Sequence, residues 1–208
     1  MKIKFLLLVI AVIFLTACAY SESPVGEYTP VPLEQMHPTD TPITETDLPV
    51  EELPSCAANF TKATVTKTVD GDTIHVEIEG KSYKVRMTGI NCPEYTKEIE
   101  PFGKESSEFT ETQLLGKTVY LEVDVSNTDK YGRLLRYIWL QVPTEITEQE
   151  ISTKMFNAKL ILNGYARTGY YPPDIKYNDY FKSLQKKAKN NKKGMWSLDK
   201  EVYKIIYS

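Results

Sequence analysis

The chain has 208 residues, of which 41% are hydrophobic and 25% are charged, and its formal net charge is −3. This composition excludes a collagen-like, a fully disordered and a polytopic membrane protein, and it allows one globular domain with appendages. Taken as an average, the negative charge argues against a nucleic-acid partner, because affinity for a phosphate backbone depends largely on Lys and Arg.

The charge is distributed unevenly along the chain. Residues 1–18 contain two basic residues and no acid, residues 19–56 contain eight acids and no Lys or Arg, and residues 57–208 contain 23 basic and 20 acidic residues. The part that we expect to fold, residues 57–208, is therefore mildly basic, and the average reflects the acidic segment before it.

The N-terminus has the pattern of a secretory signal. Two lysines precede an apolar run over residues 5–14, which is too short for the roughly 20 residues of a membrane span. The Leu-Thr-Ala-Cys sequence that ends at Cys18 resembles a bacterial lipobox, in which the cysteine becomes the lipidated first residue. We therefore expect residues 1–18 to be a signal peptide, with Cys18 anchoring the protein at the outer face of the membrane. An ordinary signal that releases a secreted protein is the alternative.

Residues 19–56 are predicted to be a disordered tether. They contain seven of the twelve prolines, together with Ser, Thr and acids, and they have no apolar periodicity. Such a segment cannot bury enough surface to offset the entropy lost on ordering. Cys56 and Cys92 are left either as a disulfide or as free thiols, since both states are possible outside the cytoplasm.

The segment from residue 60 onward is rich in predicted strands, and helices are interleaved later. Apolar alternation predicts strands over 74–78 and 83–87, joined by a turn at Gly80-Lys81, and two more over 119–125 and 134–142. Helical spacing and glycine stops predict helices over 103–115, 152–163 and 177–190. This order indicates an α+β fold, a small barrel with packed helices.

Three polar segments lie at the ends of predicted strands: Val69–Thr73, Arg86–Glu94 and Thr128–Arg133. Taken singly, each has an ordinary reading, as a hairpin turn, a helix cap or a surface ion pair. Together they contain what phosphodiester hydrolysis requires. Oxygen ligands can hold Ca²⁺, a carboxylate can deprotonate a water, and two guanidinium groups can bind a phosphate.

These three segments and a fourth at 102–110 resemble the staphylococcal nuclease (thermonuclease) family over about residues 60–198. The resemblance rests on V-D-G-D-T, on R-x-x-G-I-N-C-P-E, on F-G-K-E-S-S-E-F-T at 102–110 and on T-D-K-Y-G-R-L-L-R-Y at 128–137. It implies a five-stranded OB-fold barrel with about three helices. It also implies a monomeric Ca²⁺-dependent endonuclease that cleaves single- and double-stranded DNA and RNA with little sequence preference and leaves 3′-phosphate ends.

The resemblance also implies a role for individual residues. The catalytic residues would be Arg86, Glu94 and Arg133, with Glu94 acting on the attacking water and the two arginines on the phosphate. The Ca²⁺ ligands would be Asp72, Asn91 and the Cys92 backbone carbonyl, with Asp70 acting through water. The substrate contacts would be Lys130, Tyr131 and Tyr170.

The sequence departs from the family pattern at position 91, where the family usually has Asp. The amide oxygen of Asn91 can still bind Ca²⁺ but removes one negative charge, so we expect weakened affinity, towards the millimolar range. A catalytically weakened module that only binds nucleic acid is therefore the alternative function. The lysine-rich helix over 182–193 is read as a solvated face, with contact to nucleic acid as the alternative.

Overall fold

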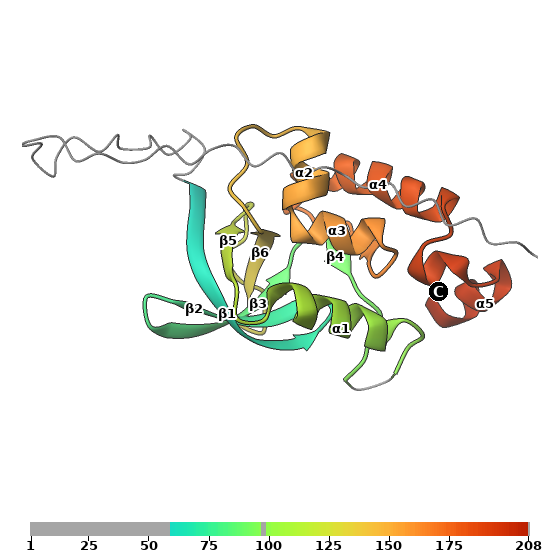
Figure 1. Ribbon diagram of the computed structural model, residues 1–208, viewed down its shortest axis with the longest axis horizontal. Coiled ribbons are helices and arrows are strands. Elements are labelled where there is room, and N and C mark those ends of the chain that lie inside the picture. The colour runs from blue at the N-terminus through green and yellow to red at the C-terminus, as the bar shows by residue number, and fades with distance from the viewer. Residues whose placement is uncertain (1–58, 97–98, 208) are drawn as a thin grey trace, which may run out of the picture. The chain divides into compact units, whose positions relative to one another are not determined.

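A computed structural model describes residues 59–96 and 99–207 of the chain (Figure 1). The predicted signal peptide, Cys18, the acidic tether and Cys56 lie outside the described residues. Among the helices of the described part, none is long and apolar enough to cross a bilayer.

Five strands form a closed barrel in the order β1-β2-β3-β6-β5. The strands are β1 (Phe60–Asp70), β2 (Thr73–Ile78), β3 (Lys81–Met87), β5 (Thr118–Glu122) and β6 (Leu134–Trp139). All neighbours pair antiparallel except β3 and β6, which pair parallel. The predicted α+β fold with a five-stranded barrel of the OB type is confirmed.

The predicted hairpin is β2–β3, and alternation explains it. Ile74 and Val76 on β2 and Val85 on β3 are fully buried, while the residues between them face outward or lie at the surface. The turn lies at Glu79-Gly80, one residue earlier than predicted, and both residues have positive φ, as two-residue hairpin turns require.

The other strands differ from the prediction at their ends. β5 ends at Glu122 because Val123 and Val125 leave the sheet and are exposed. β6 ends at Trp139 rather than at 142. β1 is not among the predicted strands, since its buried positions are small or moderate residues set among Thr and Lys, which give little apolar contrast.

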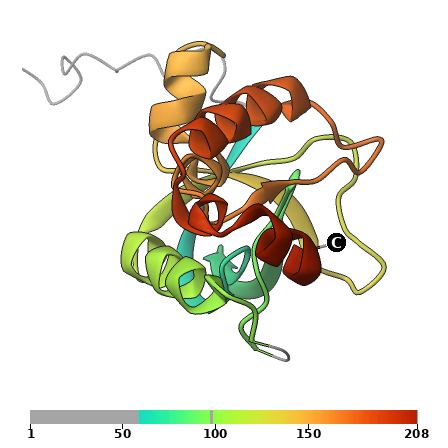
Figure 2. The same cartoon turned by 90° about the vertical axis from the view of Figure 1, so that its right-hand side faces the viewer.

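Helices cover the barrel on one side (Figures 1 and 2). They are α1 (Gly103–Leu114), α2 (Glu148–Lys154), α3 (Phe156–Leu162), α4 (Asn178–Asn190) and α5 (Lys200–Tyr207), with a 3₁₀ turn, η3 (Gly194–Ser197). The three predicted helices are present, but the middle one is two helices. Met155 between them is extended and forms a bridge with Trp139, which interrupts the helix. α5 is an addition to the prediction.

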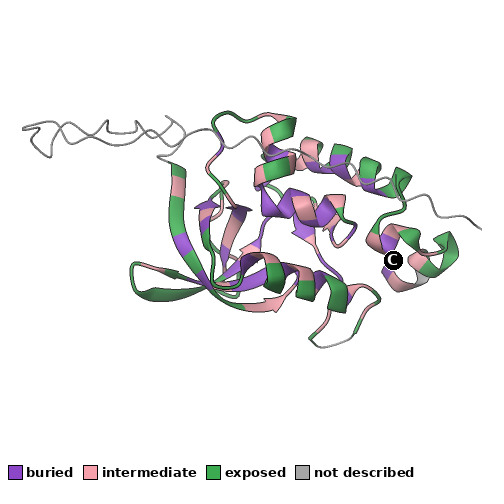
Figure 3. Ribbon diagram, viewed as in Figure 1, coloured by how far each residue is buried: buried purple, intermediate pink, exposed green. Residues whose placement is uncertain are grey.

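The core is formed by buried residues of the barrel strands together with those of the helices packed on the barrel (Figure 3). Trp139, Tyr137, Tyr177, Phe156 and Phe181 are its largest fully buried side chains. Trp139 is fully buried in this core, whereas Trp196 on η3 is only half-buried. A short second sheet pairs β4 (Ile90–Asn91) with β7 (Arg167–Thr168) and fixes the strand that carries Asn91.

Candidate active site

The polar segments predicted from the sequence meet at one end of the barrel. β1 ends at Asp70, β2 begins at Thr73, and Thr73 lies opposite Arg86 near the end of β3. Gly71 makes the turn between β1 and β2 possible, because a Cβ there would lie 2.0 Å from the Ser106 hydroxyl oxygen. The turn is thereby pressed against α1, and Asp70 and Asp72 are held on either side of it.

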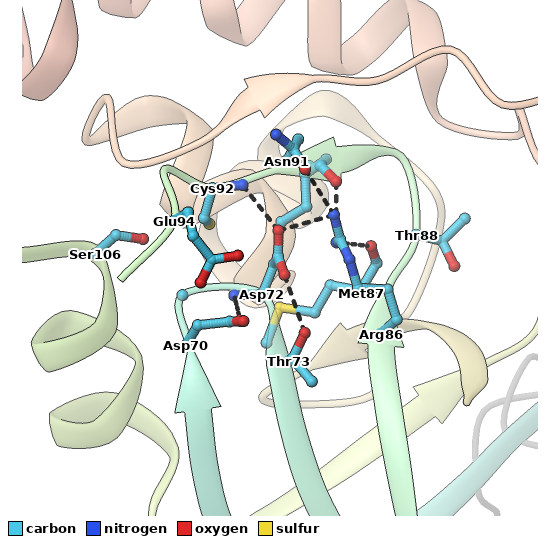
Figure 4. A network of polar contacts seen from close by, with 12 residues as sticks. Asp70, Asp72, Thr73, Arg86, Met87, Thr88, Asn91, Cys92, Glu94 and Ser106 are labelled. Atoms are coloured by element: carbon cyan, nitrogen blue, oxygen red, sulfur yellow. Dashed lines mark hydrogen bonds and ion pairs between the residues drawn. The ribbon is translucent and has the colours of Figure 1, made fainter. Parts of the chain in front are cut away.

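A cavity of about 120 Å³ lies among these segments. Its lining residues are Asp70, Asp72, Thr73, Arg86, Asn91, Cys92, Pro93, Glu94 and Arg133. All three predicted catalytic residues and all four predicted metal-site residues are therefore in one place, although they come from four separate parts of the chain. Figure 4 shows the network that joins several of them.

Asp72 is the buried centre of this network. Its Oδ2 lies 2.9 Å from Arg86 Nη2 and accepts a hydrogen bond from the Cys92 backbone N–H at 2.8 Å. Its Oδ1 accepts from the Thr73 hydroxyl at 3.1 Å. Burial raises the pKa of Asp72 to about 6, and the charge of Asp70 raises it too, while Arg86 acts in the opposite direction.

Arg86 is held by four acceptors at once. Its Nη1 donates to the carbonyl oxygens of Met87 at 2.9 Å and Ile90 at 3.1 Å, and its Nη2 donates to Asn91 Oδ1 at 2.9 Å besides Asp72. Arg86 alternates along β3 with Val85 and Met87, which are buried, and it is itself half-buried. The guanidinium is thus fixed between Asp72 and Asn91, the two side chains whose oxygens are the predicted Ca²⁺ ligands.

Glu94 is fixed by its own loop. Its Oε1 accepts from the backbone N–H groups of Tyr95 at 3.1 Å and Thr96 at 2.8 Å, and from the Thr96 hydroxyl at 2.5 Å. Its backbone N–H donates to Glu100 Oε2 at 2.9 Å. Gly103 at the start of α1 packs against this loop so closely that a Cβ there would lie 2.3 Å from the Glu94 carbonyl oxygen.

Asp129 holds Arg133 in position and is not among the residues that the sequence motifs pointed to. Its Oδ2 lies 2.7 Å from both Nε and Nη2 of Arg133, a forked ion pair. Its Oδ1 accepts the backbone N–H groups of Tyr131 and Arg133. Although burial acts to raise the pKa of Asp129, the hydrogen bonds from Arg133 and Tyr131 lower it. An Asp three residues before Gly132 is a turn signal that could have pointed to this role.

A larger cavity of about 320 Å³ adjoins the site, since both arginines line it as well. Tyr171 is one of its lining residues, whereas the predicted Tyr170 is not. The side chain of Tyr170 is 63% exposed and lies near Lys182, at 6.0 Å from its Nζ. Tyr171 is therefore better placed for a substrate contact beside Arg133 than its neighbour.

Lys130 and Tyr131 lie on the exposed turn before Arg133. The Tyr131 ring is 73% exposed, and the Lys130 Nζ and the Arg133 guanidinium lie 5.1 Å and 5.5 Å from its centroid. The predicted pair is thus accessible and joined to a catalytic candidate.

Cys92 has a buried thiol that is free within the described residues. Burial, and next the charge of Asp72, raise its pKa well above the ordinary value, so the thiol is neutral and unreactive. Within residues 59–96 and 99–207, no three His, Cys, Asp or Glu side chains converge as a metal-binding group. A cation here would depend on amide and backbone oxygens as well as on carboxylates.

Known proteins resemble this chain over its folded part. Residues 84–198 match the family described as Staphylococcal nuclease homologue. The thermonuclease of Staphylococcus hyicus is 39% identical over 143 residues, which cover 67% of this chain and 78% of that protein. The thermonuclease of Staphylococcus intermedius is 37% identical over 135 residues, 64% of this chain and 74% of that protein. Endonuclease YncB of Bacillus subtilis (strain 168) is 32% identical over 139 residues, 64% of this chain and 61% of that protein.

Proposed function

Because this chain belongs to the staphylococcal nuclease family and is a nuclease, we propose that it is a Ca²⁺-dependent endonuclease. Its substrates would be DNA and RNA, single- or double-stranded, cut with little sequence specificity to 3′-phosphate products. The observation that carries the proposal is the single cavity lined by Arg86, Arg133, Glu94 and Asp72. Two phosphate-binding groups, a base and a buried carboxylate are what hydrolysis of a phosphodiester needs in one place.

The donor set of the cavity fits Ca²⁺, which prefers oxygen ligands. Asp72 and Asn91 would supply side-chain oxygens, the Cys92 carbonyl a third ligand, and Asp70 an indirect contact through water. The raised pKa of Asp72 supports the fit. It reflects the loss of hydration of a buried carboxylate, and a bound cation would stabilise the charged form of that carboxylate. When bound, the ion supplies positive charge to the phosphate oxygens and to the attacking water.

The arginines would bind the phosphate. A guanidinium can donate two parallel hydrogen bonds to phosphate oxygens and can stabilise the extra negative charge of the transition state. Arg86 would do so by exchanging its contacts with Asn91 or Asp72 for the phosphate, since its Nη groups already have four acceptors. Asp129 keeps Arg133 in position for this task through the forked ion pair. Arg86 lines the same cavity.

Glu94 would act as the general base. It accepts a proton from a water whose oxygen attacks the phosphorus in line with the bond to the 5′ oxygen. The new P–O bond forms as the bond to the 5′ oxygen breaks, and the leaving oxygen takes a proton from solvent. The phosphate stays on the 3′ oxygen, and the hydrogen bonds of Tyr95 and Thr96 hold the carboxylate for this step.

We also propose that the nuclease acts as a monomer held at the cell surface. The signal pattern of residues 1–18 and the lipobox-like Cys18 support a lipid anchor, and the acidic residues 19–56 support a tether. Negative charge in the tether would repel both DNA and anionic lipid, which keeps the mildly basic domain accessible to its substrate.

A second candidate function is a nucleic-acid-binding module with weakened catalysis. The observation that favours it is Asn91, whose neutral amide already accepts a hydrogen bond from Arg86. Against it, a module that only binds needs no general base beside two phosphate-binding arginines.

The test is the cleavage of plasmid and single-stranded DNA by the full chain, first with Ca²⁺ and then with EGTA. We expect cutting that EGTA abolishes and that Glu94→Gln lowers about 10²–10⁴-fold, the usual contribution of a general base. Glu111→Gln is the matched control, because Glu111 is exposed on α1 outside the cavity. Binding without cutting at any Ca²⁺ concentration would favour the second candidate and reject the first.

A further inference from the structure

A separate cavity of about 450 Å³ lies among the C-terminal helices, red in Figure 2. Its lining residues come from α4, η3, α5 and the η3–α5 link: Lys189, Trp196, Leu198, Lys200, Tyr203 and Lys204. None of these residues lines either cavity of the candidate active site. The volume is in the range of small-molecule and nucleotide sites.

Aromatic rings form the wall of this C-terminal pocket. Trp196 stacks on Tyr203, with ring centroids 4.7 Å apart and planes at 30°. The Lys189 Nζ lies 4.3 Å from the Trp196 centroid, a cation–π contact. The buried indole N–H of Trp196 has no hydrogen-bond partner among the described residues. Flat rings with a cation beside them suit a nucleobase, which stacks regardless of sequence.

The charge around the pocket suits a polyanion. Residues 182–204 contain eight lysines and two acidic residues. Lys204 pairs with Glu201 at 3.0 Å, but neither Lys189 nor Lys200 forms an ion pair within residues 59–96 and 99–207. Two ammonium groups at the rim are therefore available to phosphate oxygens.

The pocket is joined to the candidate active site by a row of contacts. Tyr203 packs on Tyr207, with centroids 4.9 Å apart, and the Arg167 guanidinium lies 4.9 Å from the Tyr207 ring. Arg167 also donates to the Tyr207 carbonyl oxygen at 2.7 Å. Arg167 in turn is the β7 partner of Asn91 on β4. α5, which lines the pocket, is thus in contact with β7, and β7 pairs with the strand that carries Asn91.

We propose that the C-terminal pocket binds a nucleotide of a single-stranded substrate outside the segment being cleaved. The base would take the place of the Lys189 ammonium over the Trp196 ring, and Lys189, released from this contact, would bind the flanking phosphates together with Lys200. The inference rests on the proposed function, because it assigns the pocket to the same substrate. A single strand is favoured over an anionic bilayer, since a concave pocket with aromatic walls accepts an unpaired base and offers a flat bilayer little contact.

The test uses the full chain in EGTA, so that binding is measured without cleavage. The ligand is a fluorescein-labelled oligothymidylate of about 20 nucleotides, longer than the site of a single OB fold. We expect Lys189→Ala/Lys200→Ala to raise the dissociation constant about fivefold or more. We also expect the slope of log K against log salt to become shallower by about 1.4, the value for two lost single-strand phosphate contacts. Lys62→Ala/Lys81→Ala is the matched control, since both lysines are exposed on barrel strands far from the pocket lining.

Two more readouts separate this site from the cleavage site. Oligothymidylate should quench the tryptophan fluorescence of the wild type and not that of Trp196→Phe, which keeps a ring against Tyr203, because the remaining Trp139 is buried. Hydrolysis of a dinucleotide, too short to occupy both places, should be unchanged in the double-lysine variant. Equal weakening by both lysine pairs would overturn the proposal. So would a double-lysine variant that loses only its binding to vesicles of phosphatidylcholine and phosphatidylglycerol.

The outcomes also distinguish the two proposals. If the wild type never cuts DNA but Lys189→Ala/Lys200→Ala still weakens oligothymidylate binding, the binding role of the pocket is supported and the proposed catalysis is rejected. If the wild type cuts DNA and Lys189→Ala/Lys200→Ala binds oligothymidylate as tightly as the wild type does, only the binding role of the pocket is rejected.

Discussion

Among the ionisable residues that line the candidate active site, Asp72 is the most deeply buried carboxylate. It is 5% exposed, lies beside Asp70 and is paired with Arg86. Because burial raises its pKa, the folded protein keeps a proton on Asp72 at pH values at which the unfolded chain has already lost it.

The sign of the resulting pH dependence follows from this difference. Without Ca²⁺, the contribution of Asp72 to the free energy of unfolding should fall as pH rises from about 4 to about 6. The lower limit is the ordinary pKa of Asp and the upper limit is the pKa of Asp72 in the folded protein. Above pH 6 the contribution should no longer change. Urea unfolding in EGTA measures it, and Asp72→Asn should remove it. Asp179→Asn, on an exposed side chain of α4, is the control. Curves of wild type and Asp72→Asn that stay parallel from pH 4 to 6 would contradict the expectation.

Asn91 determines how much negative charge the proposed calcium site contains. Replacing it by Asp adds one carboxylate at a side chain that lines the cavity, so Asn91→Asp should lower the Ca²⁺ concentration for half-maximal cleavage about tenfold. For the wild type we expect half-activation near the millimolar range. A Ca²⁺ titration of cleavage measures both, and micromolar half-activation of the wild type would refute the role given to Asn91.

At the residue scale, the sequence points to residues that belong to local motifs and does not show contacts that are made through space. Asp72, Arg86, Asn91 and Glu94 were found from short motifs, and the structure places them in one cavity. Asp129 was not predicted, because its ion pair with Arg133 is visible only in the structure. Tyr170 rather than Tyr171 was predicted, because the sequence does not say which of two adjacent tyrosines lines the cavity beside Arg133.

At the scale of elements, α1 and the Glu94 loop are fitted to each other through one glycine. Gly103→Ala should stabilise an isolated helix by up to about 1 kcal/mol, because Ala has the higher helix propensity. In this protein the added Cβ would lie 2.3 Å from the Glu94 carbonyl oxygen, so one of the two segments must move.

We therefore expect Gly103→Ala to lower thermal stability and to reduce cleavage by displacing Glu94. The measurements are the melting temperature and the rate of plasmid cleavage. Thr112→Ala, an exposed change on the same helix, should leave cleavage unaltered. If Gly103→Ala kept the wild-type cleavage rate and melting temperature, the Glu94 loop would accommodate the added Cβ without loss of stability, and the expectation would be wrong.

Periodicity predicted most elements but not their interruptions. The helix over 152–163 reads as continuous, yet Met155 leaves the helix to bridge Trp139 on β6. Such a break depends on a residue 16 positions earlier in the chain, and a local window does not contain it. α5 was missed for a related reason, since Arg167 and Pro101, distant in sequence, hold Tyr207 in place.

For the whole molecule, the net charge of −3 is a misleading average. The acidic residues 19–56 lower it, while residues 57–208 carry 23 basic and 20 acidic residues. Within that domain, lysines gather over 182–204, and Asp70, Asp72 and Glu94 are used in the candidate active site. The distribution, rather than the sum, agrees with a nucleic-acid substrate.

The parallel pairing of β3 with β6 has a consequence for how the chain folds. Arg86 lies opposite Leu135, two residues after Arg133, so the two guanidinium groups are brought together only when this pair closes the barrel. The pair joins segments almost fifty residues apart, and such non-local contacts form late because loop closure costs entropy before the contacts repay it. Refolding chains will regain helical structure before they regain cleavage, and activity will therefore report the closing of the barrel rather than the collapse that precedes it.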